Sequence, residues 1–272
     1  MDLTTLLPMV ALLAFIGAIA GVIAGLLGVG GGIVLVPSFF FMFSYLGYGD
    51  SPQLMQICLA TSLATIIVTS IRSVMAHNKR GAVDWDILKT WWPWIAVGAV
   101  LGMLAAAALR SSTLQLIFGV LALIAGLYMA FGRQEWRLGS KMPEGPARIG
   151  FGGSIGFFSV LMGIGGGTFG VPLMALFNTP IHRAVATASG WGVIIAVPSV
   201  IGFLLMPTQD APPFTLGAIN LPAFALIICM TLITTPWGVK LAHKMDPKPL
   251  KRIFALFITV VALNMLRKVA GF

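Results

Sequence analysis

Long apolar runs separated by short charged connectors dominate this sequence of 272 residues. Only 9% of its residues are charged, whereas a soluble domain has roughly a quarter of its residues charged. A helix that crosses the hydrocarbon core of a bilayer needs about 20 apolar residues, and the intervals between the charged stretches have room for about seven or eight such helices. We therefore expect an all-α polytopic membrane protein with no separate soluble domain.

A polar linker at residues 133–148 divides the apolar segments into two halves. Each half begins with a long segment that the pattern Gly-x-Gly-Gly-Gly interrupts, and three uninterrupted helices follow it. In the first half, residues 1–132, the broken segment covers 3–46, with a second interruption at Pro37, and the helices cover about 54–76, 88–109 and 114–131. In the second half, residues 149–272, the broken segment covers 149–177 and the helices cover about 184–206, 216–242 and 250–266.

The two halves repeat each other in sequence. Gly28-Val-Gly-Gly-Gly-Ile-Val-Leu-Val-Pro37 matches Gly163-Ile-Gly-Gly-Gly-Thr-Phe-Gly-Val-Pro172 at an offset of 135 residues. The match extends to Leu59-Ala-Thr-Ser-Leu63 over Val185-Ala-Thr-Ala-Ser189, and to Gly81-Ala-Val-Asp84 over Gly217-Ala-Ile-Asn220, at offsets of 126 and 136. The offsets differ because connector lengths vary between the halves. We infer an internal duplication, because a chance match of glycines would not extend into the following segments.

The basic residues indicate how the helices cross the membrane. Three basic connectors, near residues 72–89, 133–148 and 240–252, are expected on the cytoplasmic side, and the connectors 44–53 and 207–213, which have no Lys or Arg, on the outer side. The connector after the helix at 88–109 has only Arg110, whereas its counterpart is the basic stretch 240–252. Equivalent loops therefore face opposite sides, as two inverted-topology repeats require. Each broken segment must then begin and end on one face, as a re-entrant hairpin or two short crossings.

The two glycine-rich interruptions predict where a substrate would bind. Each glycine costs a helix roughly 1 kcal/mol relative to alanine, and backbone freed at membrane depth must be buried or line a cavity. Half-helix N-termini at such a point favour a negatively charged ligand. The candidate binding residues there are Gly28, Gly30, Gly31, Gly32, Gly163, Gly165, Gly166, Gly167 and Thr168. The spaced glycines Gly17, Gly21 and Gly25 instead predict a face for close helix packing.

The apolar cores of the predicted helices contain no Asp or Glu. Cation and proton carriers usually place carboxylates at membrane depth, so this pattern favours an anionic or neutral substrate. Hydroxyl groups are present instead, and the candidate substrate-binding ones belong to Thr61, Ser62, Thr65, Thr187 and Ser189. The alternative is that each hydroxyl bonds a carbonyl of its own helix, as Ser and Thr often do in membrane helices.

Several polar and aromatic residues lie near the predicted membrane boundary. Arg72, His77 and Arg183 are candidates for gating or for attracting an anion, and a purely interfacial role stays open for each. Four tryptophans flank the first basic connector and predict a belt of interfacial anchors: Trp85, Trp91, Trp92 and Trp94. The sequence contains no metal-ligand cluster, phosphate-binding loop or cofactor motif. Loop placement explains the net charge of +9 more economically than nucleic-acid binding does.

Three motifs together identify a family resemblance. They are Gly21-xxx-Gly25-xx-Gly28-x-Gly-Gly-Gly32-xxxx-Pro37, its repeat ending at Pro172, and Ala60-Thr61-Ser62 followed by His77-xxx-Gly81-x-x-Asp84. This pattern resembles the sulfite exporter TauE/SafE family of membrane permeases, over essentially the whole chain. The resemblance implies a non-enzymatic secondary transporter of small sulfur-containing anions such as sulfite or organosulfonates. It also implies outward transport across a bacterial cytoplasmic membrane.

The resemblance assigns the glycine runs and the Thr61-Ser62 region as candidate site elements. The second half has Ala188 where the first has Ser62, and it has no counterpart to His77, so a symmetric site is not implied. The expected partners are a small anionic substrate and the lipid bilayer, with no nucleic acid and no cofactor, and a homodimer is a candidate assembly. Two other functions stay open: an anion channel of the same architecture, and a membrane scaffold subunit that transports nothing.

Overall fold

The computed structural model describes residues 3–27, 31–131, 137–242, 244 and 248–269, and these residues are mostly helical. The first half contains α1 (Leu3–Leu27), α2 (Gly32–Phe43), its π-helical continuation η1 (Ser44–Tyr48), α3 (Leu54–Asn78), α4 (Trp85–Ala108) and α5 (Ser111–Phe131). The second half contains α6 (Gly145–Leu161), α7 (Gly167–Leu176), α8 (Ile181–Leu204), the short strands β1 (Thr215–Leu216) and β2 (Ile219–Asn220), α9 (Leu221–Ala242) and α10 (Lys248–Val269).

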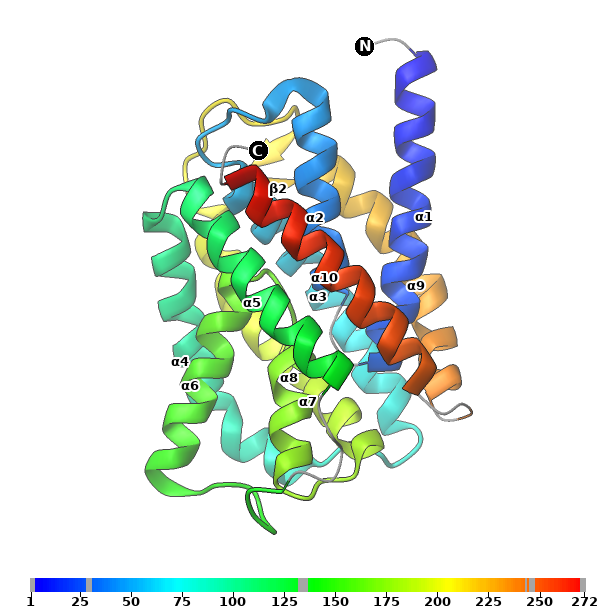
Figure 1. Ribbon diagram of the computed structural model, residues 1–272, viewed down its shortest axis with the longest axis vertical. Helices are drawn as coiled ribbons and strands as arrows, with labels where there is room; N and C mark the ends of the chain where they lie inside the picture. The colour runs from blue at the N-terminus through cyan, green and yellow to red at the C-terminus, as the bar shows by residue number, and fades with distance from the viewer. Residues whose placement is uncertain (1–2, 28–30, 132–136, 243, 245–247, 270–272) are drawn as a thin grey trace.

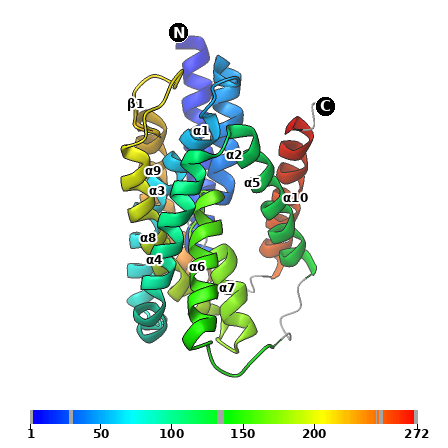
Figure 2. The same cartoon turned by 90° about the vertical axis from the view of Figure 1, so that its left-hand side faces the viewer.

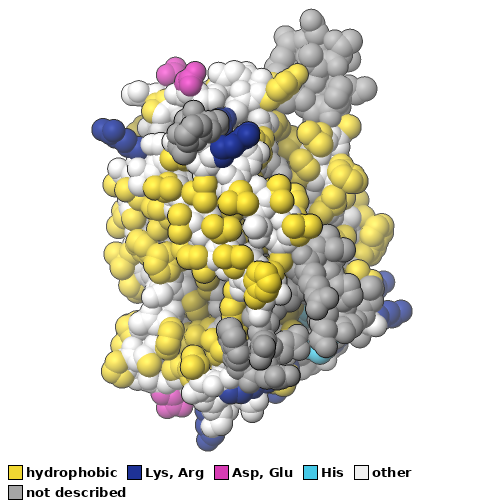
Figure 3. Space-filling view, in the orientation of Figure 1, with side chains coloured by type: hydrophobic (Ala, Val, Ile, Leu, Met, Phe, Trp, Pro, Cys, Tyr) yellow, Lys and Arg dark blue, Asp and Glu magenta, His cyan; other side chains and the backbone are white. Residues whose placement is uncertain are grey.

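Five of the described helices, α3, α4, α5, α8 and α9, are long and apolar enough to cross a membrane. The shorter apolar helices include Gly32–Tyr48, which is α2 with η1, and α7. Hydrophobic side chains form a broad band across the middle of the visible face, and charged side chains gather above and below it (Figure 3). The chain is therefore an all-α polytopic membrane protein, as its composition predicts.

The helices form an elongated bundle with two distinct ends (Figure 1). The start of α1, the β1–β2 hairpin and the end of α10 lie toward one end, and residues 137–144, which lead into α6, run along the other (Figure 2). We call this second end the basic end, because the turn from α3 to α4 there contains Lys79 and Arg80. The short helix α2 lies toward the first end and α7 toward the basic end (Figure 2).

The helix packing follows the duplication in the sequence. The most extensive contacts join α1 to α9, α4 to α6, α5 to α10 and α3 to α8, followed by α4 to α8 and α3 to α9. The counterparts of α1, α3, α4 and α5 in the second half are α6, α8, α9 and α10. Exchanging each helix for its counterpart leaves this set of pairs unchanged. Because α3 and α8 are the most buried candidate spans, this pair forms the centre of the bundle.

Glycines allow the outer helix pairs to approach closely. A side chain on Gly21 would overlap Thr234 of α9, and one on Gly25 would overlap the backbone of Thr235. The same arrangement recurs where Gly98 of α4 meets the backbone of Gly153 on α6. The interpretation of Gly17, Gly21 and Gly25 as a packing face is confirmed, since each lies against α9.

Two glycines of α6 provide a test of this packing. A Cβ on Gly156 would overlap the carbonyl oxygen of Ile95, whereas a Cβ on Gly153 would meet open space. We expect Gly156→Ala to lower the free energy of unfolding by about 1–3 kcal/mol, because α4 and α6 must move apart. Gly153→Ala should raise it by up to about 1 kcal/mol through helix propensity. Denaturant titration in mixed micelles measures both, and equal effects would contradict the packing argument.

The prolines interrupt the helices less than the sequence suggests. The first broken segment was expected to be interrupted again at Pro37, but α2 continues through this residue. Pro172, Pro198 and Pro236 likewise lie inside α7, α8 and α9. A proline removes a single N–H donor, and packed neighbouring helices tolerate that loss in membrane proteins.

Two further expectations differ from the structure. Trp91 is not an interfacial anchor, because its side chain is buried and stacks on Trp191 with 5.6 Å between ring centroids. Trp85, Trp92 and Trp94 are exposed, as expected. The helix expected from about residue 216 begins only at Leu221. The hairpin occupies the preceding residues, and the Asn220 side chain accepts a hydrogen bond from the Ala223 N–H and caps α9.

Candidate functional site

The two glycine-rich interruptions meet inside the bundle. The chain turns through Gly31 (φ 77°) into α2 and through Gly163 (φ 60°) toward α7, and both φ values lie in the left-handed region that favours glycine. A Cβ on Gly32 would overlap the carbonyl oxygen of Gly163 and lie 2.9 Å from the Ile164 Cα. Backbone therefore contacts backbone at this point, and only glycine fits. Gly28 and Gly30 lie outside the described residues.

The second interruption is buried and held by hydrogen bonds. Residues 162–167, which include Gly165, Gly166 and Gly167, are all buried. The Ser62 hydroxyl of α3 donates to the Gly163 carbonyl oxygen at 2.7 Å, and the Ile164 N–H donates to the Ser159 carbonyl at 2.9 Å. Ser62 is thus placed at the interruption, as the sequence indicates.

Both short helices start at the interruptions without a side-chain cap: α2 begins at Gly32, where the two runs touch, and α7 begins at Gly167, four residues after Gly163. The N-cap residues are Gly31 for α2 and Gly166 for α7, and neither supplies a capping hydrogen bond. The first N–H groups of a helix have no partner within it. The site therefore contains two helix N-termini that favour negative charge.

Three polar atoms near the second interruption are buried and have no hydrogen-bond partner in the described part of the structure. They are Ser159 Oγ on α6, Thr168 Oγ1 on α7 and Trp191 Nε1 on α8. Trp191 packs on the start of α7, where a Cβ on Gly166 or Gly170 would meet its side chain. Buried polar atoms are almost always paired in native structures, so three donors here are available to a ligand.

Sequence reasoning selected Thr168 among these donors but missed Ser159 and Trp191. One signal could have found Trp191: membrane tryptophans concentrate at the interface, yet this one lies about two turns inside a predicted span. Ser159 carries no comparable signal, because a single serine in an apolar run commonly bonds its own helix.

The predicted site residues Thr61 and Thr187 have a different, matched role. The Thr61 hydroxyl accepts a hydrogen bond from the Asn220 N–H at 3.0 Å, and the Thr187 hydroxyl accepts one from the Asp84 N–H at 2.9 Å. Asp84 caps α4 through the Ile87 N–H, just as Asn220 caps α9. In each half, the threonine of the Ala-Thr motif on a central helix, α3 or α8, therefore binds the capping residue of the Gly-x-x-Asp/Asn motif at the start of α9 or α4.

Replacing these threonines by valine tests that role. Thr61→Val and Thr187→Val should each lower the free energy of unfolding by about 1–3 kcal/mol, because a backbone N–H loses its acceptor. Thr90→Val is the matched control, since this exposed hydroxyl bonds only to its own helix, and we expect a change within about 0.5 kcal/mol. Unfolding titrations of the three variants provide the comparison, and a Thr61→Val protein as stable as the control would refute the role.

The remaining predicted hydroxyls bond mainly to their own helices. Thr65 donates to the Ser62 carbonyl at 2.7 Å, and Ser189 donates to the Val185 carbonyl at 2.9 Å. The Ser189 hydroxyl also lies 3.0 Å from the Ser73 hydroxyl, which joins α8 to α3. These bonds match the alternative that the sequence left open for such hydroxyls.

The three gating candidates lie away from the meeting point of the glycine runs. His77 is buried, with Nε2 3.2 Å from the Gly25 carbonyl oxygen, so it joins the end of α3 to α1. Arg183 Nη2 lies 3.2 Å from Asp84 Oδ2, and its side chain is 51% exposed. Such exposed pairs contribute little to stability. Arg72 lines a pocket at the basic end.

The buried residues near the centre are electrically neutral. Among the residues whose burial is described, the buried polar ones are Ser, Thr, Gln, Asn and His, with no Asp, Glu, Lys or Arg among them. An anion bound there would be held by neutral N–H and O–H donors, without competition from a described buried carboxylate.

Comparison with known proteins places this architecture among transporters. The sulfite exporter TauE/SafE family model matches residues 13–265. A probable membrane transporter protein of Haemophilus influenzae is 30% identical over 95% of this chain and 98% of its own length. Proteins with the same description from Methanocaldococcus jannaschii and Bacillus subtilis are 28% and 26% identical, over 96% and 94% of this chain and 96% of each relative. No solved structure matches the chain significantly.

Proposed function

The chain belongs to the sulfite exporter TauE/SafE family of membrane transporters, and on that premise we propose that it is a secondary transporter of a small sulfur-containing anion. Sulfite or an organosulfonate is the expected substrate class. The anion binds where the two glycine runs meet, and the two halves give access to it from alternate sides of the membrane.

The observation that carries this proposal is that α2 begins, uncapped, where the two glycine runs touch, and that α7 begins, also uncapped, four residues after Gly163. Helix N-termini bind anions through their free N–H groups and their dipole, and transporters direct half-helix N-termini at anionic substrates. The unpaired donors of Ser159, Thr168 and Trp191 add hydrogen bonds to the oxygens of a sulfite or sulfonate group. The Gly163 carbonyl is already satisfied by Ser62, so an acceptor that would repel the anion is partly neutralised.

Alternating access is supported by the arrangement of the two halves. The helix pairs are preserved when the halves are exchanged, and α2 and α7 lie toward opposite ends of the bundle (Figure 2). Two inverted repeats would produce this arrangement. Rocking of one half against the other would open the meeting point first to one end and then to the other.

The basic end is assigned to the cytoplasm. Lys79, Arg80, Lys141 and Arg183 lie in or beside its connectors, and cytoplasmic connectors are enriched in Lys and Arg. The resemblance to this family implies a bacterial cytoplasmic membrane and outward transport, and we propose both for this chain.

Flux measurements on the purified protein in proteoliposomes test the proposal. We expect saturable uptake of radiolabelled sulfite or a two-carbon sulfonate, and counterflow when the same anion is loaded on the opposite side. Rubidium flux serves as the cation control and should match that of protein-free liposomes. Robust rubidium flux without anion flux would overturn the anion assignment, and large single-channel currents without counterflow would indicate a channel instead.

A further inference from the structure

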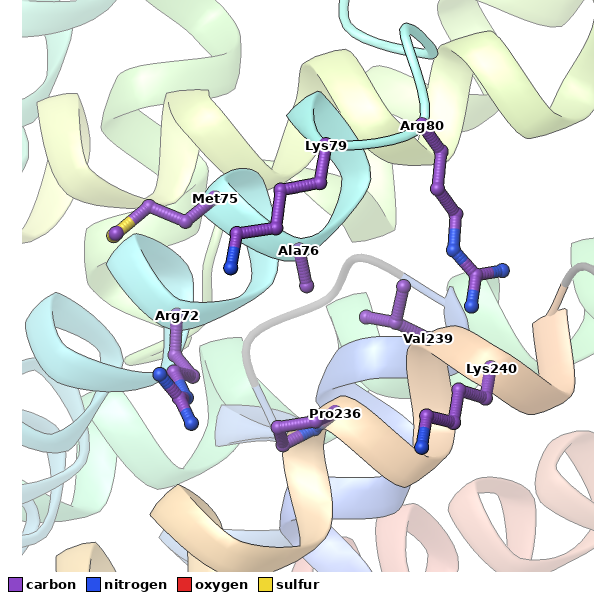
Figure 4. Close-up of a pocket in the computed structure, with 8 residues that line it drawn as sticks. All are labelled: Arg72, Met75, Ala76, Lys79, Arg80, Pro236, Val239 and Lys240. Atoms are coloured by element: carbon purple, nitrogen blue, oxygen red, sulfur yellow. The ribbon is translucent and has the colours of Figure 1, made fainter.

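Four basic side chains surround a pocket between the C-terminal parts of α3 and α9 at the basic end (Figure 4). The pocket has a volume of about 270 Å³, and its basic residues are Arg72, Lys79, Arg80 and Lys240. The other lining residues are Met75, Ala76, Pro236 and Val239. None of these eight is acidic, so no carboxylate among the described lining residues offsets the four positive charges.

Helix ends alone do not explain this cluster. Basic residues in the last turn stabilise a helix through its dipole, and Lys240 lies in the last turn of α9. Arg72 lies six residues before the end of α3 at Asn78, which is beyond the turn where the dipole acts. Its guanidinium nevertheless lines the same pocket as the three lysine and arginine side chains nearer the helix ends.

The fold does not require basic residues at this corner. The duplication places an equivalent corner at the other end of the bundle, between α8 and α4. At the offsets of 126 and 136 residues, the positions equivalent to Arg72, Lys79, Arg80 and Lys240 are Pro198, Leu205, Met206 and Leu104. All four are apolar, so the same helix corner forms without any positive charge. The positive charges are therefore not required for the helix packing, and we expect them to have a function that only the basic end has.

Exposed apolar side chains lie on α3 and α9 within one helical turn of residues that line the pocket. On α3, Ile71 and Met75 are exposed, and on α9, Ile233 and Trp237 are 55% and 60% exposed. Large apolar side chains on the outside of a membrane protein face acyl chains, and tryptophan marks the level of the lipid headgroups. The positive pocket is therefore continuous with the lipid-facing surface.

We propose that this pocket binds the phosphate group of an anionic membrane phospholipid. Basic pockets between transmembrane helices on the cytoplasmic side bind such headgroups, and arginine pairs with phosphate through two parallel hydrogen bonds. The acyl chains would lie along Ile71, Ile233 and Trp237. The inference uses the membrane orientation proposed above but not the transport function, so a failure to transport anions leaves it standing.

Native mass spectrometry of the full-length protein in detergent tests the inference. Phosphatidylglycerol and phosphatidylcholine are added separately, and the apparent Kd of each is measured. The pocket variant is Arg72→Gln/Lys240→Gln. The control variant, Lys89→Gln/Lys141→Gln, removes the same charge from exposed residues in and near the connectors of the same end that do not line the pocket. All four replaced side chains are exposed, so both variants should fold, and unchanged phosphatidylcholine binding verifies this.

We expect the wild type to prefer phosphatidylglycerol. Each basic side chain near an anionic headgroup contributes about fivefold in affinity, so the pocket variant should bind phosphatidylglycerol about 30-fold more weakly and the control variant within about twofold of wild type. Equal binding of the two lipids by wild type, or equal losses in both variants, would overturn the proposal. Displacement of the lipid by inorganic phosphate beyond an ionic-strength-matched chloride control would also overturn it, because the site would then take a free anion.

Discussion

Gly32→Ala is expected to reduce anion transport by about 10–100-fold. The added methyl group would overlap the Gly163 carbonyl oxygen and lie 2.9 Å from both the Ile164 Cα and the Ile66 Cδ1. Two of these neighbours are backbone atoms that cannot rotate away, so the two interruptions must separate. Overpacking of this kind costs about 1–3 kcal/mol, and the displacement falls on the helix N-termini that hold the anion. Initial rates of sulfite uptake in proteoliposomes measure the loss.

Gly150→Ala is the matched control for this substitution. Gly150 lies in α6, and a Cβ there would meet nothing within 4 Å, so its uptake rate should stay within about twofold of wild type. Unfolding titrations show whether lost transport is only the result of lost stability. If the Gly32→Ala protein is folded but does not transport the anion, the loss arises at the binding site. Uptake by Gly32→Ala at the wild-type rate would show that the meeting of the glycine runs is not needed for function.

Removing the unpaired donors should weaken substrate binding. Trp191→Phe and Thr168→Val delete Nε1 and Oγ1 while keeping most of each side chain's volume. A hydrogen bond to a charged group contributes about 1.5–3 kcal/mol, so each variant should raise the KM for the anion by about 10–100-fold. Neither atom has a hydrogen-bond partner in the described part of the structure, so losing the atom itself should not destabilise the fold. The free energy of unfolding should therefore stay the same or rise in Thr168→Val, whereas Trp191→Phe should lower it because the buried side chain loses packing contacts.

Trp91→Phe is the control for Trp191→Phe. Trp91 stacks on Trp191, and shortening it removes packing area without removing one of the three unpaired donors. We expect it to lower the free energy of unfolding while the KM stays within about threefold of wild type. If Trp191→Phe instead leaves the KM unchanged, as Trp91→Phe should, its indole is a packing group and not a substrate donor.

The arrangement of helices follows closely from the sequence because the bilayer restricts the choices. An apolar run of about 20 residues has few alternatives to a helix, so α3 begins at Leu54 where hydropathy places it. The glycine runs locate the ends of α1 and α6 in the same way. Boundaries set by polar contacts are harder to predict: the start of α9 depends on the Asn220 cap and on the hairpin before it.

The candidate site could be predicted only in part, because its polar partners come from distant segments. The sequence located the glycine runs and Ser62, and the bond from Ser62 to Gly163 joins residues 101 positions apart. Thr61 and Thr187 match the expected pattern equally well, yet their partners, 159 and 103 positions away, make them structural. No local signal separates a hydroxyl that binds substrate from one that holds a helix cap. The burial of Trp91 against Trp191 could not be predicted for the same reason, because the two residues are 100 positions apart in the sequence.

Anomalous diffraction from crystals grown with selenite tests the central claim most directly, because selenite is an oxyanion that replaces the sulfur of sulfite with an anomalous scatterer. We predict a peak where α2 and α7 begin, within hydrogen-bonding distance of Thr168 Oγ1 and Trp191 Nε1. A selenium peak only at the basic pocket near Arg72, or none at a selenite concentration that saturates transport, would contradict it.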